Sequence, residues 1–203
     1  MRITGGEMRG RIVEVPRSDA VRPTQDRVRE ALFNMLAPEV AGAEFLDLFA
    51  GSGAVGLEAL SRGAAHATLV EADRRHAAVA TKNASALLGP SAAARARVVV
   101  ADAYRWAEAY SGPGFTIAFA DPPYALGEER GYAAFLATLA ERGVVRPDGL
   151  FVAEMTAVQH AEETPGWDLL RDRRYGKTRI CIWRRLAAAP AASQGSISQL
   201  EFC

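Results

Sequence analysis

The run Asp121-Pro122-Pro123-Tyr124 is the part of the sequence whose residue types point most directly to a chemical step. Two successive prolines hold the backbone extended and remove two N–H donors, so this corner is rich in acceptors. The Asp121 carboxylate and the Pro122 carbonyl could each accept one proton of an –NH₂ group, and Tyr124 could stack on the base. Holding both protons favours a pyramidal nitrogen whose lone pair can attack the methyl group of a sulfonium. The run predicts methylation of a base amine, although a rigid turn with a capping aspartate has the same residue types.

A glycine-rich run from Asp47 to Gly56 could bind the cofactor. Its glycines allow a tight turn and a close approach of the backbone to a ligand, and the helix that follows offers free N–H groups. Glycines 51, 53 and 56 also satisfy the spacing of dinucleotide-binding proteins, and a turn needed only for packing would look the same. Asp47 favours S-adenosylmethionine, because a carboxylate can bind the cationic amino group but would repel a pyrophosphate. The predicted cofactor-binding residues in this run are Asp47, Phe49, Gly51, Ser52 and Gly53.

Two further acidic residues end predicted strands. Glu71 follows Leu69 and Val70, and a carboxylate at this place can accept both ribose hydroxyls of either cofactor class, unless it is simply an exposed acid. Asp102 could accept from the adenine amine while the Ala103 N–H donates to a ring nitrogen. Asp102 could also be the N-cap of the next helix, and both roles can hold at once. The second group of predicted cofactor-binding residues is Glu71, Ala72, Asp102 and Ala103.

Arginines gather near the start of the first predicted helix, at Arg22, Arg27 and Arg29. Arginine binds phosphates through two hydrogen bonds and stacks on bases. A solvated helix face with internal Arg–Asp and Arg–Glu pairs would use the same residues. Beside the methylation motif, RNA contact or support of the active site is the hypothesis that we prefer. The predicted RNA-binding residues are Arg2, Arg9, Arg11, Arg22, Thr24, Arg27, Arg29 and Lys177, with Arg173, Arg174 and Arg179 as further candidates.

Alternating strands and helices must position these residues. Strands are predicted at residues 45–49, 67–70, 97–100, 115–120 and 150–154, and helices at 55–62, 74–88, 103–110 and 128–142. Residues 2–15 are expected to form a small hairpin or extended arm, followed by a helix that begins at Pro23-Thr24 and ends at Ala37-Pro38. A closing hairpin is predicted at 167–175 and 178–184, turned at Gly176. The pattern predicts an α/β fold with a mostly parallel sheet covered on both faces, and ligands beyond the carboxyl ends of the strands.

Length and charge fit one domain that meets a polyanion. The 203 residues have zero net charge, but residues 1–30 carry seven Arg against five acids, and residues 167–185 carry seven basic residues against two acids. Such basic ends around an acidic body can present one positive face to a phosphate backbone, although a solvated surface with uneven charge has the same composition. The two cysteines and three histidines lack metal-ligand or triad spacing, so we expect no metal and a reducing, cytoplasmic setting, with the histidines in surface or loop positions. Without an apolar leader or a run of roughly 18 apolar residues, secretion and membrane spanning are not expected.

These motifs together resemble the RsmD family, bacterial methyltransferases that modify N2 of a guanine in 16S ribosomal RNA. The resemblance runs from about residue 2 to 185 and is carried by residues 2–6, 9–11, 22–34, 47–63, 70–73 and 121–124, of which 22–34 is the most specific to the family. It implies a Rossmann-like class I S-adenosylmethionine-dependent methyltransferase fold with a seven-stranded sheet and a small N-terminal hairpin. It also implies 16S rRNA as the partner, within the assembled or assembling small ribosomal subunit. We further expect a monomer.

The predicted organisation is an N-terminal arm at 1–23, a methyltransferase domain at 24–186 and a disordered tail at 187–203. Three alternatives remain open. The Asp-Pro-Pro-Tyr run also serves N6-adenine methyltransferases that act on DNA or RNA. The glycine spacing would serve a nicotinamide-dependent oxidoreductase. A non-enzymatic RNA-binding assembly factor with a vestigial pocket is the remaining hypothesis.

Overall fold

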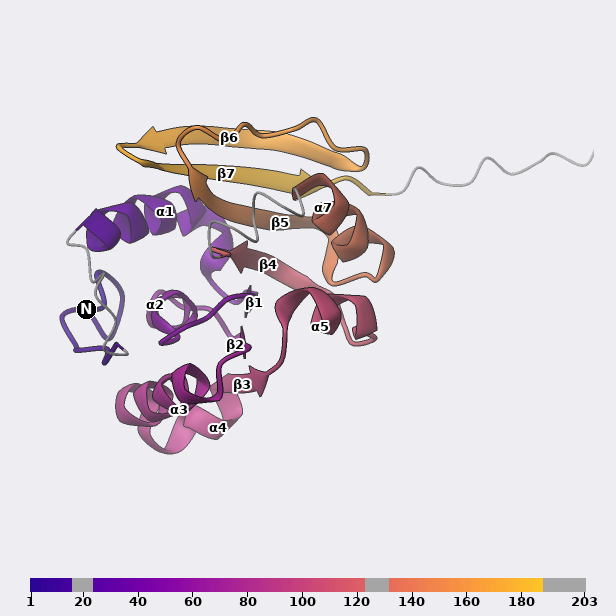
Figure 1. Ribbon diagram of the computed structural model, residues 1–203. Coiled ribbons are helices and arrows are strands. Elements are labelled where there is room, and N and C mark those ends of the chain that lie inside the picture. Colours follow the sequence, from indigo (N-terminus) through magenta and orange to yellow (C-terminus); the bar gives the residue numbers. More distant parts are fainter. Residues whose placement is uncertain (16–23, 123–131, 188–203) are drawn as a thin grey trace, which may run out of the picture.

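The sheet of the protein contains seven strands in the order β3-β2-β1-β4-β5-β7-β6 (Figure 1). The computed structural model describes residues 1–15, 24–122 and 132–187. The strands are β1 (Glu44–Asp47), β2 (His66–Glu71), β3 (Ala96–Val100), β4 (Phe115–Ala120), β5 (Val145–Thr156), β6 (Trp167–Tyr175) and β7 (Thr178–Arg185). Strands β1 to β5 pair in parallel, whereas β7 runs antiparallel to both β5 and β6. The predicted α/β class and seven-stranded sheet are confirmed.

Helices cover both faces of this sheet (Figure 1). One face carries α1 (Thr24–Val40), α2 (Ala54–Ser61) and α3 (Arg74–Leu88), and the other carries α5 (Ala103–Ala109) and α7 (Tyr132–Glu141). Successive strand residues alternate between two cores: Phe45 packs on the α1–α3 side and Leu46 on the α5–α7 side. Every residue of β4 is buried, as expected of a central parallel strand with helices on both faces.

Several elements differ from the sequence prediction. Helix α1 continues past Pro38 to Val40, because Val40 is buried in the α1–α3 core and its packing outweighs the backbone hydrogen bond that a proline cannot make. Strand β5 begins at Val145, five residues early, with a register irregularity against β4. The short helices η1 (Gly89–Ser91) and α4 (Ala92–Arg95) were not predicted, since segments of three or four residues show no periodicity.

The N-terminal arm, residues 1–15, folds back on itself and packs beside α2. Arg2 and Ile12 form an isolated antiparallel bridge, while Ile3, Met8 and Val13 are buried in the α1–α3 core. The approach to α2 is close: a Cβ atom at Gly6 would lie 1.8 Å from the Ser61 carbonyl oxygen. A hairpin-like arm is therefore present, as expected from its glycines.

Some predictions fall outside this description. Three segments lie outside the described residues: 16–23, the predicted tail from 188 onward, and 123–131, which holds Pro123, Tyr124 and the start of the helix predicted at 128–142. Among the helices that the structure describes, none is both long and apolar enough to cross a bilayer.

Candidate active site

Acidic side chains from four neighbouring strands meet at the carboxyl edge of the sheet. They are Glu71 on β2, Asp47 on β1, Asp121 directly after β4 and Glu154 on β5. Because parallel strands end at the same edge, residues far apart in the sequence come together here. The first three of these acids were predicted from the sequence, whereas Glu154 was not.

Asp47 is almost completely buried, with 1% of its surface exposed. Its Oδ2 accepts a hydrogen bond from the Gly56 N–H at 3.0 Å. Burial raises the pKa of Asp47 to about 7, the Gly56 hydrogen bond opposes this shift, and the negative charges of Asp121 and Glu71 add to it. A cation bound nearby would therefore favour the ionised form of this carboxyl group.

Glycines shape the loop between β1 and α2. Gly51 and Gly53 have positive φ angles of 53° and 78°, so both use the freedom that glycine allows. Gly56 serves packing, because a Cβ atom there would lie 2.2 Å from Leu69 Cδ2 on β2. The Ser52 carbonyl accepts from Asn83 Nδ2 at 2.9 Å, which turns this part of the loop toward α3.

Glu71 links this loop to the turn after β2. Its Oε2 accepts from the Gly51 N–H at 2.7 Å, and its Oε1 accepts from the Asp73 N–H at 2.8 Å. Asp73 in turn caps α3 by accepting from the N–H groups of Arg75 and His76, and these hydrogen bonds lower its pKa. The Glu71 carboxylate is thus held in one place by two backbone donors.

A cavity of about 220 Å³ lies beside Glu71 at the mouth of the sheet. Its lining brings together six predicted site residues with three that were not predicted: Phe49, Glu71, Ala72, Asp102, Ala103 and Asp121, together with Val70, His76 and Ala101. Apolar groups form much of the wall and carboxylates are set among them, an arrangement that fits a flat heterocycle joined to a sugar. The predicted Asp47, Gly51, Ser52 and Gly53 do not line this cavity.

Asp102 has the capping role proposed from the sequence, while its contact with adenine stays a prediction. Its Oδ1 accepts from the Arg105 N–H at 3.0 Å, so it caps α5, and the residue also lines the cavity. Phe49, another lining residue, contacts Tyr104 edge-on at 5.7 Å between ring centroids, which braces its ring against α5.

Two ionisable residues at this edge, His76 and Glu154, were not predicted. His76 lies in the first turn of α3, half-buried, with Nδ1 4.0 Å from Glu71 Oε1, whereas the sequence indicated only a surface or loop position. The position of His76 three residues after the capping Asp73 could have indicated that it lies near Glu71. Glu154 could have been found by the argument used for Glu71 and Asp102, since it also follows a run of apolar strand residues.

Asp121 lies at the rim of the cavity. Its own surface is exposed, yet the surrounding protein atoms raise its pKa to about 6. The neighbouring Pro122 is buried. Pro123 and Tyr124, the other two predicted catalytic residues, lie outside the described residues.

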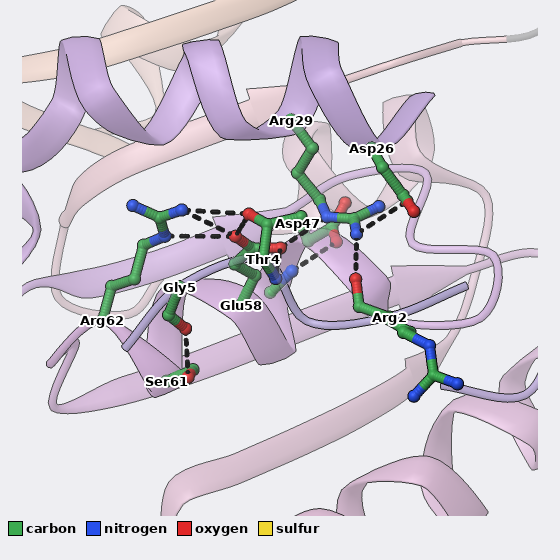
Figure 2. A network of polar contacts seen from close by, with 10 residues as sticks. Arg2, Thr4, Gly5, Asp26, Arg29, Asp47, Glu58, Ser61 and Arg62 are labelled. Atoms are coloured by element: carbon green, nitrogen blue, oxygen red, sulfur yellow. Dashed lines mark hydrogen bonds and ion pairs between the residues drawn. The ribbon is translucent and has the colours of Figure 1, made fainter. Parts of the chain in front are cut away.

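Arg29, one of the predicted RNA-binding residues, is internal. Only 5% of its surface is exposed; its Nε donates to Glu58 Oε2 at 2.5 Å and its Nη2 to Asp26 Oδ1 at 3.0 Å and to the Arg2 carbonyl. Glu58 lies between the guanidinium groups of Arg29 and Arg62 and also accepts from the Thr4 hydroxyl (Figure 2). A guanidinium enclosed in this way cannot reach a phosphate, so for Arg29 the structure favours the internal ion pairs over the RNA contact.

The other predicted RNA-binding residues are placed differently. Arg9, Arg27 and Lys177 are exposed. Arg2 Nη1 donates to the Gly10 carbonyl at 2.9 Å within the arm, and Arg11 binds the Ala86 and Leu87 carbonyls at the end of α3. Arg22 lies outside the described residues, and the Thr24 side chain is not described.

The sheet order, the antiparallel β7 between β5 and β6, and a cavity beyond the carboxyl ends of β1, β2 and β4 define the class. The fold is that of the Rossmann-like class I methyltransferases, whose cofactor is S-adenosyl-L-methionine. A family model described as "Conserved hypothetical protein 95" matches residues 1–184. The chain belongs to this family, which is the RsmD family indicated by its motifs.

Similar proteins support this assignment. The Ribosomal RNA small subunit methyltransferase D of Escherichia coli strain K12 is 41% identical over 190 residues, covering 92% of this chain and 91% of the relative. The protein of the same name from Haemophilus influenzae is 35% identical over 179 residues, covering 87% and 89%. The solved structure of the Escherichia coli protein yhhF superposes with a TM-score of 0.80 at 40% identity, covering 93% of this chain and 99% of that one.

Proposed function

We propose that this protein transfers a methyl group from S-adenosyl-L-methionine to the exocyclic N2 amine of a guanine in 16S rRNA of the small ribosomal subunit. The observation that carries the proposal is that Asp121 lines the same cavity as Glu71 and Asp102. An acceptor for a base amine and acceptors for the cofactor are thereby within reach of one another. Coarser support comes from the family, whose relatives are named as ribosomal RNA methyltransferases.

The chain's own residues fit the cofactor in three places. Glu71, already fixed by two backbone donors, would accept the ribose hydroxyls. Asp102 and the Ala103 N–H would hold the adenine against Phe49. Asp47 would accept from the methionine amino group, directly or through water. When bound, S-adenosylmethionine supplies a methyl group on a positively charged sulfur, an electrophile that a nitrogen lone pair can attack.

The corner after β4 would hold the base. With its pKa near 6, Asp121 is mostly ionised at neutral pH and can accept one proton of the amine, while the Pro122 carbonyl accepts the other. Both acceptors act by positioning the nitrogen, which is the main contribution that a protein makes to a displacement of this kind. Stacking of the base on Tyr124 remains a prediction from the sequence.

Exposed cations lie near this edge. Lys177 occupies the turn between β6 and β7, beside the pair Thr156–Thr178, which closes the carboxyl end of β5. Arg27 is exposed near the start of α1, and we infer that it faces the same edge. These residues would contact the RNA backbone around the flipped base. A monomer that acts in the cytoplasm on the assembled or assembling subunit completes the proposal.

The test is to incubate the protein with labelled S-adenosylmethionine and small subunits that lack the modification, and then to map the methylated base by mass spectrometry. Methylguanine in 16S rRNA is the expected product. If the product is instead methyladenine in DNA or RNA, the substrate is an adenine and the guanine proposal is wrong. Binding of NADH with no binding of S-adenosylmethionine, measured by calorimetry, would favour the oxidoreductase.

The variant Asp121→Ala tests the catalytic corner. It should bind S-adenosylmethionine as the wild type does but lose methyl transfer by about 100-fold or more, because one positioned hydrogen-bond partner of the reacting group is removed. Asp168→Ala is a matched control, because Asp168 is exposed on β6 near the opposite edge of the sheet. Full activity of Asp121→Ala would exclude the assigned role.

A further inference from the structure

Glu154 is a carboxyl group at the active-site edge to which the proposed reaction assigns no role. It follows Ala153, and Ala153 pairs with Ala120 on β4, so Glu154 is the register neighbour of Asp121 across the β4–β5 pair. Val152, two residues before Glu154, belongs to the core on the α1–α3 side, as does Phe119 before Asp121. Since residues two apart in a strand share a face, both carboxyl groups are directed to the same side of the sheet.

Among the residues that the structure describes, few other charges act on Glu154. Its strand partner on β7 is Ile180, which is fully buried. The hydroxyl of Tyr132 on α7 donates to the Glu154 backbone carbonyl at 3.1 Å. Within residues 1–15, 24–122 and 132–187, the charged groups that act on its carboxyl are Asp121 after β4 and Arg29 on α1. Arg29 also forms ion pairs with Glu58 and Asp26, and their negative charges partly offset its effect on Glu154.

We propose that Glu154 is a positioning residue for Asp121, with the two adjacent carboxyl groups sharing one proton in the resting enzyme. This rests on the proposed function of Asp121 as the acceptor for the base amine. Protonated Glu154 donates to one oxygen of ionised Asp121 and leaves the other oxygen free for the amine. Two ionised carboxylates at these adjacent positions would repel one another, whereas a shared proton holds them together.

The electrostatics of the pair agree with this arrangement. Burial raises the pKa of Glu154 to about 8, the negative charge of Asp121 adds to the shift and Arg29 opposes it. The pKa of Asp121, whose own surface is exposed, is raised to about 6 by desolvation from the protein atoms around it. Between these values the pair carries one proton and one negative charge, and the two titration steps belong to the pair as a unit. The aromatic hydroxyl of Tyr132 stays neutral, because burial and then Asp121 raise its pKa far above the physiological range.

The first experiment uses the free protein and needs no substrate. Carboxyl carbons of Asp and Glu are labelled with ¹³C, and their chemical shifts are followed by NMR from about pH 4 to about pH 10, a range that spans both expected titration steps. We expect steps near 6 and 8 at these two residues, of which Glu154→Gln keeps only the step near 6. Titration of Glu154 near its ordinary value of 4.5 would overturn the proposal.

The second experiment compares the pH dependence of kcat in three proteins. Wild-type kcat should fall above about pH 8 as Glu154 loses its proton, and Glu154→Gln should abolish this fall, because an amide still donates to Asp121 at every pH. Glu154→Ala should lower kcat at all pH values, by a factor on the order of 100 for a misplaced reacting group, with KM for both substrates unchanged.

Glu163→Gln serves as the control, since Glu163 is exposed in the loop between β5 and β6, and it should keep the wild-type profile. If Glu154→Gln and Glu154→Ala reduce kcat equally, or if neither changes the pH dependence of kcat, Glu154 does not position Asp121. Failure of the proposed function is recognised separately, because the wild type would then methylate no small subunit while the NMR titration still reports on the pair.

Discussion

Single carboxyl groups decide the chemistry of this site through their burial. Asp47 has 1% of its surface exposed, and burial together with two acidic neighbours raises its pKa to about 7 despite the opposing hydrogen bond from its one backbone donor. A carboxylate in such surroundings is poorly solvated, and the ligand that best stabilises its ionised form is a cation. The ammonium group of S-adenosylmethionine meets this requirement, whereas a pyrophosphate would worsen it.

A pH dependence of cofactor binding follows for Asp47. Above about pH 7 the carboxyl group is ionised before the ligand arrives, whereas below about pH 7 it must first lose its proton. The affinity for S-adenosylmethionine should therefore rise as the pH increases toward this value and then level off. Calorimetry in two buffers of different ionisation enthalpy should show proton release on binding about one pH unit below the pKa and little about one unit above it.

Asp47→Asn provides the comparison, because it keeps the size of the side chain and removes the titrating group. This variant should bind more weakly and lose most of the pH dependence. If the wild type binds S-adenosylmethionine with equal affinity at pH values below and above the pKa of Asp47, Asp47 does not contact the amino group of the ligand.

At the level of elements, helix α1 has an inner side that stabilises the fold and an outer side that is free to bind. On the inner side, Arg29 and Arg62 enclose Glu58, which is completely buried, and Thr4 connects the N-terminal arm to the same carboxylate (Figure 2). Arg62 also lies over the Phe33 ring at 5.1 Å. The network thus joins the arm, α1 and α2 beside the active site.

Two arginines of α1 should respond differently to substitution. Arg29→Met should lower the free energy of unfolding by about 3 kcal/mol, because it removes one partner of a buried ion pair and leaves the Glu58 charge undercompensated. Arg27→Met should change it by no more than about 0.5 kcal/mol, because Arg27 is exposed. Urea unfolding followed by circular dichroism measures both effects.

A double variant isolates the ion pair from the packing of the side chain. Replacing both Arg29 and Glu58 by Met should recover part of the stability that Arg29→Met loses, because no unpaired charge then remains buried. An Arg29→Met protein as stable as the wild type would show that Arg62 alone satisfies Glu58.

At the scale of the whole molecule, exposed basic residues come from both ends of the chain. Net charge is zero, yet the β6–β7 turn places Lys177 beside the carboxyl end of β5, and Arg27, far away in the sequence, is exposed near the start of α1. An RNA backbone that approached this edge would meet positive charge around an acidic centre. Charges placed in this way guide the phosphates to the rim and leave the carboxylates to the base and the cofactor.

Charge reversal tests this arrangement. Arg27→Glu and Lys177→Glu should each weaken binding of a 16S rRNA fragment, and each should reduce the slope of log K against log salt by roughly one for each phosphate that the variant no longer binds. Affinity for S-adenosylmethionine should stay the same. Arg146→Glu is the matched control, because Arg146 is exposed near the amino end of β5, at the far edge of the sheet. Equal weakening in all three variants would indicate that the position of the charge is unimportant.

Local patterns in the sequence were enough to predict the fold class and most of the cavity. Apolar runs of strand length followed by helical periodicity predicted β4 and α3 with the bounds that the structure has, and acids at strand ends identified Glu71 and Asp102. This works because a parallel strand buried on both faces needs apolar residues along its length and admits polar ones where it ends.

Contacts between distant elements were decided only by the tertiary structure. Arg27 and Arg29 look alike in the sequence, and Arg29 became internal because α1 packs against Glu58, 29 residues further along the chain. Likewise, α1 extends past Pro38 because Val40 has a core to enter, and Glu154 acquires a partner because β5 pairs with β4. A residue's type and local spacing determine what it can bind, but the packing of helices and strands determines which groups come within reach, and with them whether a charge meets solvent, a ligand or an opposite charge.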